Sequence, residues 1–317
     1  MKNCILILIF ILHINLVAET STHLDENVDY DFQLIKFYLN KEEYNLIIDH
    51  INSIEKETFI TDSLKYFRAK AYVGLENWEE ASTLFSNILK TSKNEKLSLT
   101  VIEELKEVLD HFDAMISIEK ISNTLDDMKN DNLRPELLFI LAEIYEENQL
   151  FSEANDVYKT ILKETDFKNK AKLNLKMVTN YIFLKEFENA IKILKPIIAL
   201  NDSLLNEDAL FFNYIANHSL NKFKKAKESL LKLYIDYPNH RNKAEIIHGL
   251  AELYVLEQQY LISWYLLNEL YEISSQAQKI AIYEEIKIIK ELIVHDSLTV
   301  DQFKNFKPVF DEFEDGE

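Results

Sequence analysis

The sequence predicts an all-α protein, an α-solenoid of about seven helix-turn-helix repeats with a C-terminal capping helix. Only 3 Gly and 4 Pro occur among 317 residues, which leaves little turn chemistry for a β-rich fold. Residues 63–88 read as two amphipathic segments around a short polar break, the pattern of a helical hairpin. Related units recur along the chain, and such hairpins bury their apolar faces only by stacking on neighbours.

An aromatic marker near the end of each first helix gives the repeat length. Tyr38 is followed by Tyr72 after 34 residues, and later spacings are 73, 36, 36 and 37 residues. The 73-residue gap indicates one further unit, which we place at Lys96–Leu109 and Asp113–Ile121. The aromatic marker recurs at Tyr145, Tyr181 and Tyr254, and Asn217 takes its place between the last two.

Small and large residues alternate at fixed distances from the marker. A small residue follows nine positions later, and a large one four positions after that. This arrangement predicts close backbone contact at the small residue and interlocking side chains at the large one. The small set is Ala81, Ala154, Ala190, Ala226 and Ser263, and the large set is Phe85, Tyr158, Leu194, Leu230 and Leu267.

These residues resemble the tetratricopeptide-repeat (TPR) family. The best matches are Ala69, Tyr72, Ala81 and Phe85 in one unit and Ala142, Tyr145, Ala154 and Tyr158 in another, and Pro238 fits the family's closing proline. The resemblance covers about residues 29–274 and implies a right-handed solenoid. The family's leading Trp is absent, and units of 36 to 37 residues exceed its usual length of about 34.

The resemblance also implies a binding face on the first helices, which line a concave groove in this family. The corresponding positions lie six and two residues before each marker. Several of these positions hold aromatic residues, and two interpretations of their rings stay open. They are either anchors for an extended peptide or inserted helix, or part of the core between neighbouring hairpins. The candidate binding residues are Phe32, Lys36, Tyr66, Lys70, Phe139, Glu143, Leu175, Phe211, His248 and Glu252.

The two ends of the chain have their own signals. Residues 1–18 have one lysine, an apolar run and a small residue, Ala18, which favours a signal peptide cleaved near Ala18 over a spanning helix. An uncleaved membrane anchor is the alternative. Residues 19–28 are expected to be loose. Residues 275–317 are expected to hold a capping helix at 277–294 and, beyond 300, a short docked helix with an acidic end.

Other predictions concern Pro196 and the chemistry that the chain lacks. Pro196 predicts a bend at 193–195. The net charge of −19 argues against nucleic acid as a partner. The histidines show no His-Glu-x-x-His spacing and no Gly-rich phosphate loop occurs, so we expect no catalytic residue, metal or cofactor. Cys4 is the only cysteine and lies in the leader, so no disulfide is expected.

The sequence therefore favours a non-enzymatic scaffold, exported to the periplasm or envelope of a bacterium, that holds an envelope protein or peptide in its groove. Two alternatives remain. One is a ligand-binding receptor or enzyme with a site around His218, His248 and Glu252. The other is a structural subunit anchored to the membrane by an uncleaved N-terminal helix, which N-terminal sequencing would separate from an exported protein.

Overall fold

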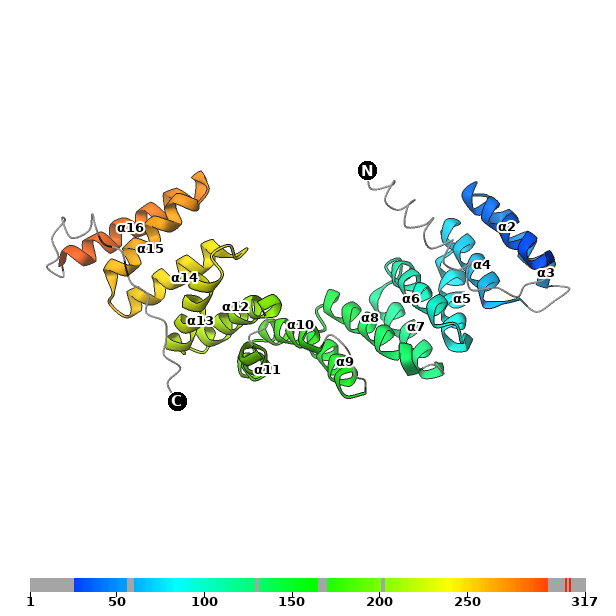
Figure 1. The fold of residues 1–317 in the computed structure, drawn as a ribbon, viewed down its shortest axis with the longest axis horizontal. Helices are drawn as coiled ribbons and strands as arrows, with labels where there is room; N and C mark the ends of the chain where they lie inside the picture. The colour runs from blue at the N-terminus through cyan, green and yellow to red at the C-terminus, as the bar shows by residue number, and fades with distance from the viewer. Residues whose placement is uncertain are drawn as a thin grey trace. The chain divides into compact units, whose positions relative to one another are not determined.

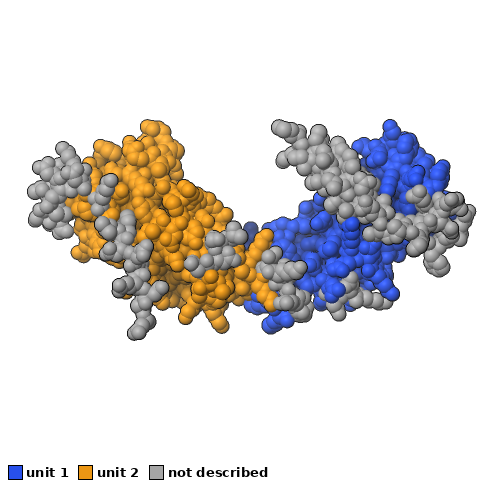
Figure 2. All heavy atoms as spheres, in the orientation of Figure 1, with its two compact units in different colours: residues 1–167 blue, residues 168–317 orange. Residues whose placement is uncertain are grey.

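The computed structural model describes residues 26–55, 60–128, 131–164, 170–200 and 203–295, together with Phe306 and Pro308. These residues form an all-α solenoid of fifteen α-helices, α2 to α16, and one short 3-10 helix (Figure 1). Contacts divide the chain into two compact units, residues 1–167 and 168–317, coloured separately in Figure 2. The predicted signal peptide lies outside the described residues.

Unit 1 contains four hairpins packed in chain order. The second helix of one hairpin contacts the first helix of the next hairpin. First helices also contact each other, as α4 and α6 do, and so do second helices, as α5 and α7 do. The helices are α2 (Glu26–Asn40), α3 (Tyr44–Glu55), α4 (Asp62–Gly74), α5 (Trp78–Thr91), α6 (Glu95–Leu109), α7 (Ala114–Asp127), α8 (Arg134–Glu147) and α9 (Phe151–Glu164), with the 3-10 turn Asp131–Leu133 before α8.

Unit 2 contains three hairpins and a last helix that packs on α15, as predicted for a cap. Pro196 lies inside α11, which continues through it rather than ending there. The helices are α10 (Lys170–Phe183), α11 (Phe187–Leu200), α12 (Ser203–Ser219), α13 (Phe223–Asp236), α14 (Lys243–Leu256), α15 (Tyr260–Ile273) and α16 (Gln276–His295).

The helix predicted beyond residue 300 is wrong at the two residues described there. Phe306 and Pro308 belong to no helix, and each is partly buried. Proline lacks the backbone N–H that a helix interior needs and disfavours helical backbone at the residue before it. The remainder of the predicted tail helix lies outside the described residues.

The alternation of small and large residues is confirmed as the packing scheme of both units. All five predicted small residues have 0% exposed surface. Four of the five large residues are also 0% exposed and the fifth, Leu267, is 2% exposed. The second helices α5, α9, α11, α13 and α15 therefore each place a small side chain where backbones approach and a large one between neighbours.

The markers coincide with a repeated helix end. In six hairpins the marker's carbonyl accepts a hydrogen bond from the N–H five residues later, at 2.8 to 2.9 Å. The residue immediately before this N–H donor has a left-handed backbone, with φ between 56° and 60°. This is the Schellman ending, which usually places glycine at the left-handed position. Here that position holds Glu42, Glu76, Gln149, Lys185, Asn221 and Gln258.

The third hairpin uses a different turn, which accounts for its missing marker. Its α6 and α7 confirm the predicted unit, although α7 continues to Asp127. The His111 and Phe112 N–H groups donate to the carbonyls of Val108 and Leu109 without a left-handed residue. The His111 ring stacks on Trp78, with ring centroids 3.6 Å apart.

Glycine at a left-handed turn is expected to stabilise the protein. Left-handed backbone costs an ordinary residue about 1–2 kcal/mol, and the extra entropy of unfolded glycine takes back about 0.5–1 kcal/mol. We therefore expect Gln258→Gly to raise the unfolding free energy in urea by about 0.5–1 kcal/mol. Asn221→Gly is the matched control with a smaller gain, because asparagine tolerates this backbone. Equal loss of stability in both variants would contradict the assignment.

Candidate functional site

The predicted binding residues of unit 1 lie on first helices, and several hold neighbouring hairpins together. The Lys70 ammonium on α4 donates to Glu104 on α6 at 2.6 Å, and the Tyr66 hydroxyl donates to the same carboxylate at 3.2 Å. Only 13% of the Lys70 side chain and 15% of the Glu104 side chain are exposed. One step further, Lys106 on α6 donates to Glu143 on α8 at 2.5 Å.

These contacts form a polar ladder along the first helices α4, α6 and α8. Burial, followed by the charge of Glu104, raises the pKa of Tyr66. The hydrogen bond to Glu143 raises the pKa of Lys106 despite its partial burial. Since Lys70 and Glu143 are paired within the protein, less of their charge is available to a partner.

The aromatic members of the set pack against other rings of the same unit. Phe32 lies 5.9 Å from Phe67, measured between ring centroids, and Phe139 lies 6.0 Å from Tyr158. Tyr66 is buried, whereas Phe32, Phe139 and Lys36 are partly exposed. The half-buried rings could therefore present an edge to a ligand while the rest packs in the core.

In unit 2 the predicted residues become more exposed along the chain. Leu175 on α10 and Phe211 on α12 are buried. His248 on α14 has 47% of its side chain exposed and pairs with Glu285 of α16 at 2.9 Å. Glu252, one turn further on α14, is exposed. The accessible part of the first-helix face in this unit is therefore its polar end on α14.

His218, named in the alternative site, belongs to the end of α12. Its ring packs between Tyr214 and Phe223, with centroid distances of 5.7 and 5.5 Å. Within the described residues, no group of three or more His, Cys, Asp or Glu side chains is placed to hold a metal ion. Among the described helices, none has the length and apolar character of a membrane span.

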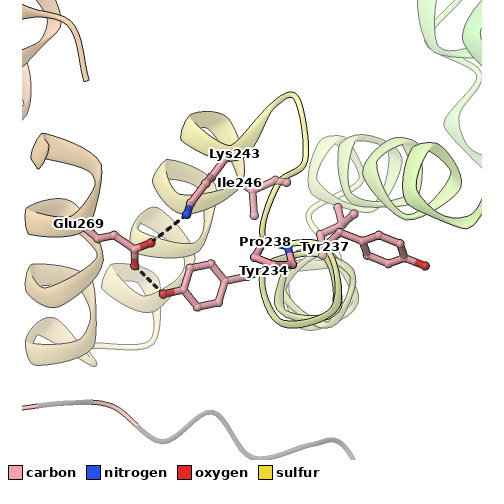
Figure 3. A pocket seen from close by; sticks show the side chains of 7 residues that line it. Tyr234, Tyr237, Pro238, Lys243, Ile246 and Glu269 are labelled. Carbon is pink, nitrogen blue, oxygen red and sulfur yellow. Dashed lines mark hydrogen bonds and ion pairs between the residues drawn. The ribbon is translucent and has the colours of Figure 1, made fainter. Parts of the chain in front are cut away.

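A pocket that the sequence did not suggest lies between α13, α14 and α15 (Figure 3). Its volume is about 220 Å³. Glu269 of α15 points into it, accepts a hydrogen bond from the Tyr234 hydroxyl at 2.5 Å, and lies 3.7 Å from the Lys243 ammonium. The other lining residues are Leu233, Tyr237, Pro238 and Ile246.

Two tyrosines line the pocket, and each makes a hydrogen bond to a different helix. Tyr237 points away from Glu269, and its hydroxyl accepts a hydrogen bond from Asn206 of α12 at 3.1 Å. Burial and the hydrogen bond to Glu269 raise the pKa of Tyr234. No sequence pattern indicated this pocket, because the pairing of Lys243 with Glu269 depends on how α13, α14 and α15 meet.

Comparison with solved structures agrees with a solenoid of helical hairpins. The C-terminal part of a TPR repeat-containing protein from Cytophaga hutchinsonii matches with a TM-score of 0.54 and 14% identity, over 79% of this chain and 98% of that one. A tetratricopeptide repeat protein from Parabacteroides merdae matches with a TM-score of 0.45 and 14% identity, over 73% and 87% of the two chains.

The match to the Cytophaga structure shows that the fold is that of TPR solenoids, as the spacing of small and aromatic residues predicted. Searches against models of protein families and against curated proteins found no match. At 14% identity the likeness to the Cytophaga structure concerns the fold, and function has to be argued from surfaces.

Proposed function

We propose that this protein is a non-enzymatic scaffold that binds a protein or peptide along the first-helix face of its hairpins. The observation that carries the proposal is the stacking of hairpins itself, because it presents side chains from successive first helices on one face. Extended surfaces of this kind suit a peptide or helix better than a small substrate.

The accessible parts of that face indicate where contact occurs. In unit 1 the partly exposed rings Phe32 and Phe139 offer aromatic edges, and aromatic residues commonly anchor interfaces. In unit 2 the exposed Glu252 and the His248–Glu285 pair offer polar contacts. Such groups at a rim set orientation and association rate more than affinity.

We propose further that the protein works after export, in the periplasm or envelope of a bacterium, on an envelope protein. The support is the charge and apolar pattern of residues 1–18. N-terminal sequencing of the protein from its native cells is expected to find a start near Glu19. A start at Met1 in the membrane fraction would instead support the anchored alternative.

Site-specific crosslinking tests the binding face in the native cell. A photoreactive amino acid at Glu252 is expected to give a discrete crosslinked protein, because this side chain is exposed on the first-helix face. The matched control places the same group at Gln259, which is exposed in the turn before α15. Equal crosslinking from both positions would contradict a specific face.

A second measurement distinguishes a scaffold from a receptor or enzyme. A small ligand that binds only the folded state raises the melting temperature. At a ligand concentration one hundred times the dissociation constant, the unfolding free energy increases by about 2.7 kcal/mol. Melting with a metal panel and a small-molecule library is expected to leave the midpoint unchanged. A reproducible shift with one compound would favour the receptor.

A further inference from the structure

Unit 2 carries a basic region on an acidic chain. Residues 170–243 contain 13 Lys and Arg against 7 Asp and Glu, a net charge of +6, whereas the whole chain has −19. These residues form α10 to α13 and the start of α14. A local reversal of sign on this scale attracts an oppositely charged partner.

We use the name lysine face for six exposed lysines on the second helices α11 and α13, both of which contact the first helix α12. The ammonium group of none of them makes an ion pair or hydrogen bond with a described residue, whereas those of Lys70 and Lys106 of unit 1 are both paired. Their charge is therefore available to a ligand. The six are Lys192 and Lys195 of α11 and Lys222, Lys224, Lys225 and Lys232 at and along α13.

Apolar side chains are interspersed with these lysines. Leu200 at the end of α11 is 77% exposed, and on α13 Phe223 is 36% and Ile235 is 40% exposed. Phe223 lies directly between Lys222 and Lys224 in the chain. A surface that combines ammonium groups with exposed apolar side chains fits a segment that combines carboxylates with aromatic rings.

The end of this chain has that composition. Residues 309–317 contain five acidic residues and no basic one. Phe310 and Phe313 are spaced among them, with Asp311 and Glu312 between the two rings. The acidic residues are Asp311, Glu312, Glu314, Asp315 and Glu317.

The chain is long enough to bring these residues to the lysine face. Thirteen residues separate His295, the end of α16, from residue 309. An extended chain of that length reaches about 45 Å. Contacts run in order from α16 through α15 and α14 to α13, a distance of about 30 Å at 8–10 Å per helix pair. Phe306 and Pro308 are already partly buried.

We propose that residues 309–317 bind the lysine face of the same molecule. Carboxylates would pair with the ammonium groups of α13 and α11, and the two phenylalanines would cover the exposed apolar side chains. A tethered segment has an effective concentration of the order of millimolar, so weak contacts suffice for occupancy. This interaction is separate from the proposed binding on the first helices.

A labelled synthetic peptide of residues 309–317 tests the proposal on full-length protein. One sample is the native chain, and the other carries Asp311→Asn, Glu312→Gln, Glu314→Gln and Asp315→Asn, which weaken the protein's own tail. We expect the peptide to bind the neutral-tail chain at least tenfold more tightly, by fluorescence anisotropy, with affinity falling as salt rises. Equal affinity for both chains would overturn the proposal, because the face would then be open to an external acidic partner.

Charge reversal locates the site. In the neutral-tail chain, Lys222→Glu, Lys225→Glu and Lys232→Glu together are expected to abolish peptide binding. The matched control changes net charge equally through Lys41→Glu, Lys93→Glu and Lys96→Glu, all at exposed lysines of unit 1, and is expected to bind as before. A similar loss of peptide binding in both triple variants would overturn the assignment of binding to the lysine face. If the native chain excludes the peptide more strongly as the protein concentration rises, the tail binds a second copy of the chain. That result would also overturn the proposal.

Discussion

Alkaline solution is expected to unfold this protein steeply above pH 10, because several buried tyrosines are stable only when neutral. Burial and a nearby carboxylate raise the pKa of Tyr66 and of Tyr158, and burial followed by the charge of Glu257 raises the pKa of Tyr254 to about 12. All three side chains are buried.

The sign follows from proton linkage. Above pH 10 the unfolded tyrosines lose protons while the folded ones keep them, so the unfolding free energy falls as pH rises. Each tyrosine contributes up to about 1.4 kcal/mol per pH unit, so three remove up to about 4 kcal/mol per unit. The loss begins near pH 10 and, for Tyr254, continues until its folded pKa of about 12.

Far-ultraviolet circular dichroism and tyrosinate absorbance, followed together against pH, measure this effect. Loss of helix and ionisation of the buried tyrosines are expected in the same pH interval. Tyr254→Phe is a control that keeps the ring and removes one titrating group, so stability should fall less steeply with pH. Full tyrosine ionisation with intact helix would contradict the prediction.

Replacing Phe85 by alanine is expected to lower the unfolding free energy by about 3–5 kcal/mol, the cost of truncating a fully buried aromatic ring. Phe85 is 0% exposed on α5, and its ring lies 6.2 Å from that of Tyr66 on α4. The vacancy would loosen the interlocking of this hairpin with its neighbours, on which a solenoid depends.

Urea denaturation followed by circular dichroism tests this change. The control is Phe37→Ala on α2, where the ring is 55% exposed, so the expected change is within about 0.5 kcal/mol. A similar cost for the two variants would contradict the packing scheme derived from the spacing of small and large residues.

Most of the fold could be predicted because its signals are local. The marker, the small residue nine positions later and the large residue after it are fixed by one hairpin turn and one helix contact. The third hairpin was harder to place, since its turn at His111 and Phe112 replaces the Schellman ending. At Pro196 the prediction was a bend, and the helix α11 continues through this residue, because proline removes one helix hydrogen bond without always ending the helix.

The candidate surfaces were less predictable because they depend on the angle around each helix and on contacts between hairpins. An aromatic residue at helical spacing serves either core or binding face, and Phe211 is buried while Phe139 is half-buried. The pairing of Lys70 with Glu104 and the pocket beside Glu269 join residues more than twenty positions apart. The lysine face was hidden within a chain of negative net charge.

The polar ladder has a direction that bears on how such a chain can change length in evolution. Each step has an amine on the earlier hairpin and a carboxylate on the later one, Lys70 to Glu104 and then Lys106 to Glu143. Duplication of the α6–α7 hairpin would bring Lys106 opposite a second Glu104, and its loss would bring Lys70 near Glu143. Unlike charges would meet in either case, so gain or loss of a whole module preserves electrostatic compatibility between its neighbours.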